Sequence, residues 1–355
     1  MSNQVGISIY LQNGSHENKK IIEKAIAHKM QYIFSSLNIP EENGENFVTD
    51  VKELISLGQQ YQINIIFDVN QQTLEKFNLN TYPELKQIGI THLRLDYGFE
   101  TEEIVALSKE FHLVLNASTL TESFVLDLLE KGLCSEDIIA CHNYYPKCYS
   151  GLSYQGVKEM NDLLHQYHFK TMGFVAGDLK KRGPFYEGLP TVEESRNMDF
   201  LLSVLKLHDD AACDIVMVGD VDIQIESWRK LKAFSEDCVE LEVNLDESYH
   251  YLYGVSNHDR IDNSEYVIRS VESRGLLDEG HDIKGHNSIN RHVGAICISN
   301  ENYGRYQGEL EIAKKELSAD KRINVCGMVS KNHLEYLPYI RKGRGFILKK
   351  EEAKA

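Results

Sequence analysis

The feature of this chain that most restricts its fold is an alternation of short apolar segments with amphipathic segments over its first two-thirds. A continuous apolar, β-branched run is typical of a strand that is buried on both faces of a sheet. The predicted strands are residues 6–11, 32–37, 63–69, 92–97, 113–118, 138–145, 171–177 and 214–220. Helices between such strands predict a parallel sheet that helices cover on both sides.

The segments between the strands carry helical signals. In ENKKIIEKAIAHK, Ile22, Ala25 and Ile26 recur at the spacing of one helix face. Thr119 is followed three residues later by Glu122, which predicts a capping box at the start of the helix in LTESFVLDLLEKGL. These signals support helical crossovers between the strands.

The number of strand–helix units selects the fold class. Eight units over the first two-thirds of the chain match a (β/α)8 barrel, whose typical size is roughly 250 residues. A doubly wound open sheet is the alternative. The chain has no G-x-G-x-x-G after its first strand and no Walker A loop, so nucleotide-binding versions of that alternative lose support. We expect an α/β fold with a TIM barrel in residues 1–238.

The pattern changes from about residue 240. Short runs such as VELEVNL, HVGAICISN and INVCGMVS are separated by polar segments rich in turn residues. This arrangement is typical of antiparallel strands. We expect residues 239–355 to form a second, small antiparallel β domain.

Composition limits the classes of partner. The formal net charge is −16, which argues against nonspecific binding to nucleic acid or to an anionic membrane. The N-terminus lacks a basic region followed by a long apolar stretch, so we expect a cytoplasmic protein. The seven cysteines form no C-x-x-C pair, and we expect neither disulfides nor a metal or other cofactor. The oligomeric state stays open.

In (β/α)8 barrels the chemistry lies at the C-terminal ends of the strands. The polar residues predicted there are Asp68, Asp96, Asn116, His142, Asn143 and Asp220. Arg94 and Asp96 lie two apart on one strand and therefore share a face. A buried pair of this kind is either structural or part of a working site. We expect Arg94 to keep Asp96 ionised by lowering its pKa.

Carboxylates dominate this set, and paired carboxylates are what glycoside hydrolysis requires. A magnesium site built from Asp68, Asp96 and Asp220 is one alternative. A Schiff base on Lys147 is another. Either of these would suit a sugar-phosphate lyase or isomerase instead of a glycosidase. A binding protein that does not catalyse a reaction is a third. In the loop KKRGPFYEG, Arg182 is the predicted clamp for a phosphate or carboxylate.

Several ordered segments resemble one family, the MupG-type 6-phospho-N-acetylmuramidases. They include GISIYL, FSSLNIPEE, LRLDYG, LNASTLTE, HNYYPKCYSGLS, RGPFYEGLPTVE, VIRSVESRG and ISNENYGRYQGELEIAKKEL. The resemblance implies a TIM barrel followed by a cyclophilin-like β-barrel. It also implies a cytoplasmic glycosidase of cell-wall recycling that cleaves N-acetylmuramic acid 6-phosphate from N-acetylglucosamine.

The chain departs from the family pattern at two places. The third strand ends in DVN, with Asn70 in place of the usual serine, and Lys147 stands where the family has arginine. Lysine would replace a bidentate clamp with a point charge. The exact substrate is therefore open.

The residues receive the following predicted roles. Asp96 is the first catalytic candidate, and Glu41, beside the apolar Ile39 and Pro40, is the predicted acid. Asp68 and Glu187 are the reserve carboxylates. The predicted substrate-binding residues are Arg94, Asn116, His142, Asn143, Arg182, Asp220 and, from the second domain, Arg305. Because the substrate carries an acetamido group, one carboxylate could orient that amide instead of attacking the sugar.

Overall fold

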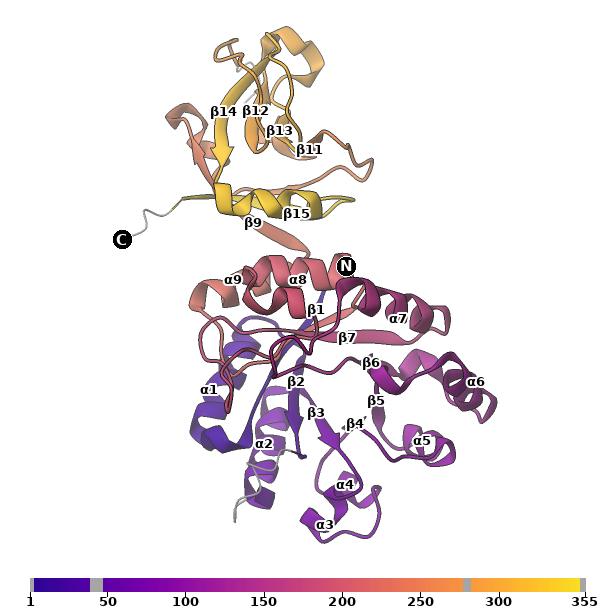
Figure 1. Ribbon diagram of the computed structural model, residues 1–355. Helices are drawn as coiled ribbons and strands as arrows, with labels where there is room; N and C mark the ends of the chain where they lie inside the picture. The colour runs from indigo at the N-terminus through magenta and orange to yellow at the C-terminus, as the bar shows by residue number, and fades with distance from the viewer. Residues whose placement is uncertain (1–2, 39–46, 277–281, 352–355) are drawn as a thin grey trace. The chain divides into compact units, whose positions relative to one another are not determined.

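The computed structural model describes residues 3–38, 47–276 and 282–351. These residues fall into two compact units, which divide between Ser235 and Glu236. Each unit has its own sheet (Figure 1).

The first unit is a closed barrel of eight parallel strands in sequence order, in which β1 pairs with β8. The strands are β1 (Gln4–Ser8), β2 (Tyr32–Ser36), β3 (Asn64–Val69), β4 (His92–Leu95), β5 (His112–Asn116), β6 (Ile139–Cys141), β7 (Lys170–Val175) and β8 (Ile215–Val218). Each coincides with or overlaps one predicted strand. The predicted TIM barrel is confirmed, and the open doubly wound sheet is excluded.

Helices surround the strands of this unit (Figure 1). They are α1 (Gly14–Ala27), α2 (Phe47–Tyr61), α3 (Thr73–Phe77), α4 (Glu84–Gln87), α5 (Thr101–Ser108), α6 (Glu122–Glu130), α7 (Tyr154–Gln166), α8 (Phe200–Asp209) and α9 (Ile225–Ser235). In α1 the predicted Ile22 and Ala25 are buried, as the helical spacing indicated.

The predicted cap of α6 was wrong by two residues. The N-cap is Thr121, whose side chain accepts a hydrogen bond from the backbone N–H of Phe124. Thr119 belongs to a preceding 3-10 turn, where its hydroxyl donates to the carbonyl of Asn116. The turn after β5 thus uses a threonine that the sequence pattern had assigned to the helix.

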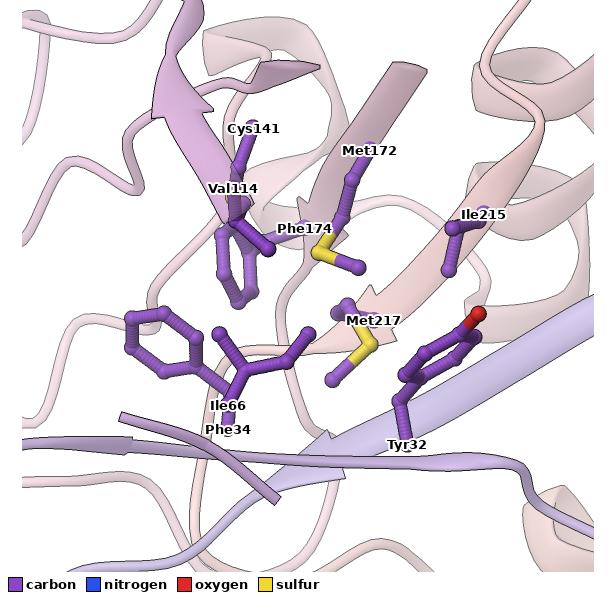
Figure 2. Packing of buried hydrophobic residues seen from close by; sticks show 9 residues of the cluster. All are labelled: Tyr32, Phe34, Ile66, Val114, Cys141, Met172, Phe174, Ile215 and Met217. Atoms are coloured by element: carbon purple, nitrogen blue, oxygen red, sulfur yellow. The ribbon is translucent and has the colours of Figure 1, made fainter. Parts of the chain in front are cut away.

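The interior of the barrel is filled by apolar side chains that point toward one another (Figure 2). The cluster consists of Tyr32, Phe34, Ile66, Val114, Cys141, Met172, Phe174, Ile215 and Met217. Burial of each large side chain contributes about 1.5–3 kcal/mol. A Cβ at Gly6 on β1 would overlap the carbonyl oxygen of Tyr32 and the sulfur of Met217, so only glycine fits there.

The second unit contains a seven-stranded sheet in the order β10-β15-β9-β14-β12-β13-β11. The strands are β9 (Cys238–Leu245), β10 (Ser256–His258), β11 (Val267–Arg269), β12 (Ala295–Ser299), β13 (Leu310–Ala313), β14 (Ile323–Val329) and β15 (Gly345–Lys350). A bridge between Asp259 and Ser270 joins the two edges, so the sheet is nearly closed. The sheet is mixed: β15 pairs with β9 in parallel, and the other strand pairs are antiparallel, as expected. The cyclophilin-like assignment stays a prediction.

Candidate active site

The register of three neighbouring strands brings polar side chains together at the rim of the barrel. Ser36 at the end of β2 is paired with Asp68 on β3, and Asp68 is paired with Arg94 on β4. The hydroxyl of Ser36 donates a hydrogen bond of 2.8 Å to Oδ2 of Asp68. These three buried side chains form a continuous polar layer above the apolar core.

Arg94 is the centre of this layer. Its guanidinium is 4% exposed. Nη1 donates to Oδ1 of Asp68 and, at 3.3 Å, to Oδ1 of Asp96. Nη2 donates to Oδ1 of Asn143, which follows β6. One buried cation therefore holds two carboxylates and an amide from three different strand ends.

Burial and neighbouring charges have opposite effects on the pKa values of Asp68 and Arg94. Burial raises the pKa of Asp68, the Arg94 guanidinium offsets part of that rise, and the charge of Asp96 adds to it. Burial by itself would lower the pKa of Arg94, but Asp68 and Asp96 more than reverse this effect and leave it raised. Arg94 is therefore a permanent positive charge at the rim.

Asp96 is the more accessible carboxylate, with 27% of its side chain exposed. Nδ2 of Asn116 donates to its Oδ1 at 3.2 Å. Asn116 is itself held in one orientation, because its Oδ1 accepts hydrogen bonds from the N–H and hydroxyl of Ser118. Both donors to Asp96 reach the same oxygen, and no described residue donates a hydrogen bond to its Oδ2.

A cavity of about 160 Å³ opens on these groups. We call it the carboxylate cavity; it is lined by Phe34, Asp68, Arg94, Asp96, His142, Asn143, Tyr144 and Phe174. One wall is charged and the other is aromatic. The aromatic wall has Tyr144 set edge-on against Phe34 and Phe174, with ring centroids 6.3 and 5.2 Å away. Burial raises the pKa of Tyr144 to about 12, so its hydroxyl is neutral at physiological pH.

His142 lines the cavity but is 2% exposed. Its Nε2 lies 2.7 Å from Oδ1 of Asn161 on α7, and Nδ2 of Asn161 donates to the carbonyl of Ala211. Burial lowers the pKa of His142, which favours the neutral ring. Since Asn161 presents its acceptor to Nε2, Nε2 carries the proton and Nδ1 is the acceptor. His142 is thus suited to accept a hydrogen bond, and not to act as a charged acid.

The loop that follows β7 is held by Asp220, which is 0% exposed. Its carboxylate accepts backbone hydrogen bonds from Gly177 (2.8 Å), Arg182 (2.9 Å) and Leu189 (3.1 Å). Burial raises the pKa of Asp220, and these three donors partly offset the rise. This geometry favours a role in positioning the loop over the predicted direct contact with substrate.

Three other predicted residues are not among those that line the carboxylate cavity. Glu187 is exposed, accepts a weak hydrogen bond from Cys148 and does not line the cavity. Arg305 lies in the second unit, is exposed and donates to the hydroxyl of Tyr306 at 2.9 Å. Glu41 lies outside the described residues. Their roles stay predictions.

Sequence reasoning missed a pair that joins two rim loops. Arg196 is 5% exposed and donates a hydrogen bond to the carboxylate of Glu193. It also donates to the backbone carbonyls of Gly188 and Tyr145. Glu193 accepts from the backbone N–H of Tyr149 at 2.8 Å. The hydrogen bond from Arg196 lowers the pKa of Glu193 to about 2. The i,i+3 spacing of the pair is visible in the sequence, but its partners in the other loop are not.

The described residues contain no group of three or more His, Cys, Asp or Glu side chains arranged to hold a metal. Of the three aspartates in the magnesium alternative, Asp68 and Asp96 contact Arg94, and Asp220 accepts three backbone N–H groups. Lys147, the candidate for a Schiff base, is exposed and does not line the carboxylate cavity. No helix in the described ranges has the length and apolar character needed to cross a membrane.

Comparison with known proteins adds the following. Residues 5–233 match the family model described as 6-phospho-N-acetylmuramidase, N-terminal, and residues 238–349 match its C-terminal counterpart. A solved structure of a conserved Enterococcus faecalis protein of unknown function is 28% identical, with a TM-score of 0.77 over 98% of this chain and 96% of that one. An uncharacterised B. cereus protein is 23% identical, with a TM-score of 0.76 over 99% and 100%, and shows the same fold. The comparison with curated proteins found no match.

Proposed function

Since the chain belongs to the 6-phospho-N-acetylmuramidase family, we propose that it hydrolyses the bond between N-acetylmuramic acid 6-phosphate and N-acetylglucosamine. The family name supports a glycoside hydrolase. The disaccharide, the cytoplasmic location and the place in cell-wall recycling are our proposal. The observation that supports it most directly is Arg94, which holds Asp68 and Asp96 together at the mouth of the carboxylate cavity.

The carboxylate cavity has the chemistry that a sugar ring requires. Aromatic rings on one wall offer an apolar face to the C–H side of a sugar. On the other wall, Asn143 and His142 provide polar atoms for its hydroxyl or acetamido groups. A carboxylate close to the sugar ring stabilises the positive charge that develops at the anomeric carbon in the transition state.

We assign that role to Asp96. It is more exposed than Asp68, and its Oδ2 accepts no hydrogen bond from the described residues. Arg94 and Asn116 both bind Oδ1 and so fix the direction of the carboxylate. Asp96 would either attack the anomeric carbon or accept the N–H of the 2-acetamido group, whose carbonyl oxygen would then attack. Asp68, enclosed by Ser36 and Arg94, would orient Arg94.

Departure of the second sugar requires a proton donor. Glu41 remains our candidate on sequence grounds, with Glu187 in reserve. Asp68 has a pKa raised by burial, but its direct contact with Arg94 makes it a poor source of a proton.

The test is turnover of the phosphorylated disaccharide, and of its unphosphorylated form, by wild type and Asp96→Asn. We expect wild type to release N-acetylglucosamine from the phosphorylated compound. The variant should lose about 10²- to 10⁴-fold in kcat, the usual contribution of a positioned catalytic group. Asp162→Asn, on the exposed face of α7, is the control. A folded wild type that cleaves neither compound would refute the proposal, and binding without turnover would identify a phosphosugar-binding protein.

A further inference from the structure

A second cavity lies at the rim, on the side of β1, β7 and β8. Its volume is about 330 Å³, and we call it the basic cavity. It is lined by Gln12, Asn13, Lys180, Lys181, Arg182, Gly183, Pro184, Tyr186 and Val221. Three consecutive cationic residues line it, and no acidic side chain is part of the lining. In a chain with a net charge of −16, such a local concentration of positive charge needs a physical explanation.

Arg182 is the residue of this cavity that is most constrained. It is 9% exposed, and its guanidinium carbon lies 4.5 Å from the ring centroid of Tyr10. Its Nε is buried and has no hydrogen-bond partner among the described residues. A buried guanidinium without an acceptor is costly unless a ligand supplies one. Stacking on Tyr10 holds the planar group in a fixed orientation, as bidentate recognition of an oxyanion requires.

The backbone of the loop that carries Arg182 is held in place by Asp220. Asp220 accepts the backbone N–H groups of Gly177, Arg182 and Leu189, and thus ties both ends and the centre of the loop to the end of β8. These bonds are buried. Asp220 therefore positions Arg182. The charge of Lys181 also acts on this carboxylate and, like the backbone donors, lowers its pKa.

The other polar groups of the cavity fit the same kind of ligand. Nζ of Lys181 is 3.4 Å from the carbonyl of Glu187, a contact that does not neutralise its charge. Asn13 is the N-cap of α1 and makes no capping hydrogen bond with its side chain. The positive end of the α1 dipole thus lies at the cavity. Lys180 is the third cation of the lining.

The basic cavity adjoins the carboxylate cavity. Val221, from its lining, packs in one cluster with Tyr10 and Leu189 against Tyr144. Tyr144 is in turn part of the wall of the carboxylate cavity. The two cavities are therefore neighbours along the rim, as a single substrate that occupies both requires.

We propose that the basic cavity binds the 6-phosphoryl group of the substrate, with Arg182 as its principal ligand, Lys181 as a second cation and Asp220 as the residue that positions Arg182. This inference rests on the proposed function. A phosphate monoester carries a charge of about −1.5 to −2 at pH 7, which matches a site with more than one cation. A single carboxylate, such as that of the lactyl group, would leave this charge partly uncompensated.

The experiment compares wild type with Arg182→Met, Arg182→Lys and Lys181→Met. The first readout is the ratio of kcat/KM for the phosphorylated and unphosphorylated disaccharides. The second is the affinity for inorganic phosphate, measured by calorimetry, which needs no turnover. Lys158→Met removes an exposed lysine of α7 that does not line the cavity and serves as the control. Circular dichroism checks that each variant is folded.

We expect Arg182→Met to lower both the ratio and the phosphate affinity by about tenfold to a hundredfold, as loss of charge-assisted hydrogen bonds implies. Arg182→Lys should recover only part of this loss. Lys181→Met should show a smaller loss, of about threefold to tenfold in both quantities. Lys158→Met should show no loss in either. If Arg182→Met misfolds, Lys181→Met decides the question.

The two proposals can fail separately. A wild type that prefers the phosphorylated compound, with the preference intact in Arg182→Met and Lys181→Met, would overturn the phosphoryl site and leave the glycosidase standing. If wild type cleaves neither compound but binds phosphate, and Arg182→Met loses that binding, the glycosidase proposal fails and the phosphate site stands. A wild type that neither binds phosphate nor prefers the phosphorylated disaccharide would refute the site.

Discussion

Asp68 and Arg94 form a buried ion pair between two adjacent strands of the barrel. They are direct register partners on β3 and β4, and the guanidinium donates to the carboxylate where 4% of the arginine side chain and 10% of the aspartate side chain are exposed. The sequence pattern predicted that Arg94 pairs with Asp96, which is two residues away on the same predicted strand. The structure adds Asp68 and makes it the closer partner, at the shorter contact.

The first prediction concerns this pair. Arg94→Met should lower the free energy of unfolding by about 3–5 kcal/mol, because it leaves the Asp68 carboxylate buried without its cation. The double variant Arg94→Met/Asp68→Leu should be less destabilised than the single one, since the carboxylate then left without Arg94 is that of Asp96, which is partly exposed. Urea unfolding of the three proteins provides the comparison. Equal stabilities for wild type and Arg94→Met would contradict the role of the pair.

The second prediction concerns the aromatic wall. Tyr144→Leu should raise KM for the phosphorylated disaccharide about threefold to tenfold, because stacking of this kind is worth about 0.5–1.5 kcal/mol. Tyr144→Phe keeps the ring against Phe34 and Phe174 and should leave KM close to that of wild type. Steady-state kinetics of the two variants measures the difference. A large loss in Tyr144→Phe would instead assign the hydroxyl a part in binding.

The third prediction concerns the loop pair Glu193–Arg196. The pKa of Glu193 is lowered to about 2 in the folded protein. A lowered carboxyl pKa contributes stability that is complete above the unfolded value, about 4.3, and that is lost as pH falls through the folded value. Glu193→Gln should therefore lower Tm at pH 7, and the difference from wild type should shrink from about pH 4 downward. Melting curves of both proteins from pH 7 to pH 3 test this prediction. A difference in Tm that grows as pH falls would contradict the stabilising role of this pair.

The fourth prediction concerns His165, whose contribution to stability is lost as pH rises and not as it falls. A hydrogen bond to Asp214, with Nε2 2.9 Å from the carboxylate, raises the pKa of His165. A raised histidine pKa contributes stability that is complete below the unfolded value, about 6.5, and that is lost as pH rises through the folded value. His165→Gln should thus be less stable than wild type at pH 6 and approach it at pH 9. Thermal melts at both values provide the measurement, with His168→Gln, in the turn after α7, as the control.

The sequence predicted much of the barrel, because that fold depends on local periodicity. Apolar runs such as the one that contains Ile65, Ile66 and Phe67 are buried as continuous strands. It also predicted which polar residues end the strands, since each follows its run directly. It misplaced the helix start, which is at Thr121, and it did not reveal the parallel pairing of β15 with β9, because caps and strand direction depend on contacts outside the local pattern.

The sequence by itself determined the order of the barrel's strands and helices, the family, and several of the polar side chains at the barrel rim. Only the tertiary structure decided which of them meet. Neighbouring strands lie about 4.8 Å apart, whereas residues two apart on one strand are separated by nearly 7 Å. Arg94 therefore reaches Asp68 across the sheet more closely than it reaches Asp96, which lies two residues further along the chain, just past the end of β4. The same reason hid the role of Asp220, whose three backbone donors are 31 to 43 residues away in the chain and converge only when the barrel closes.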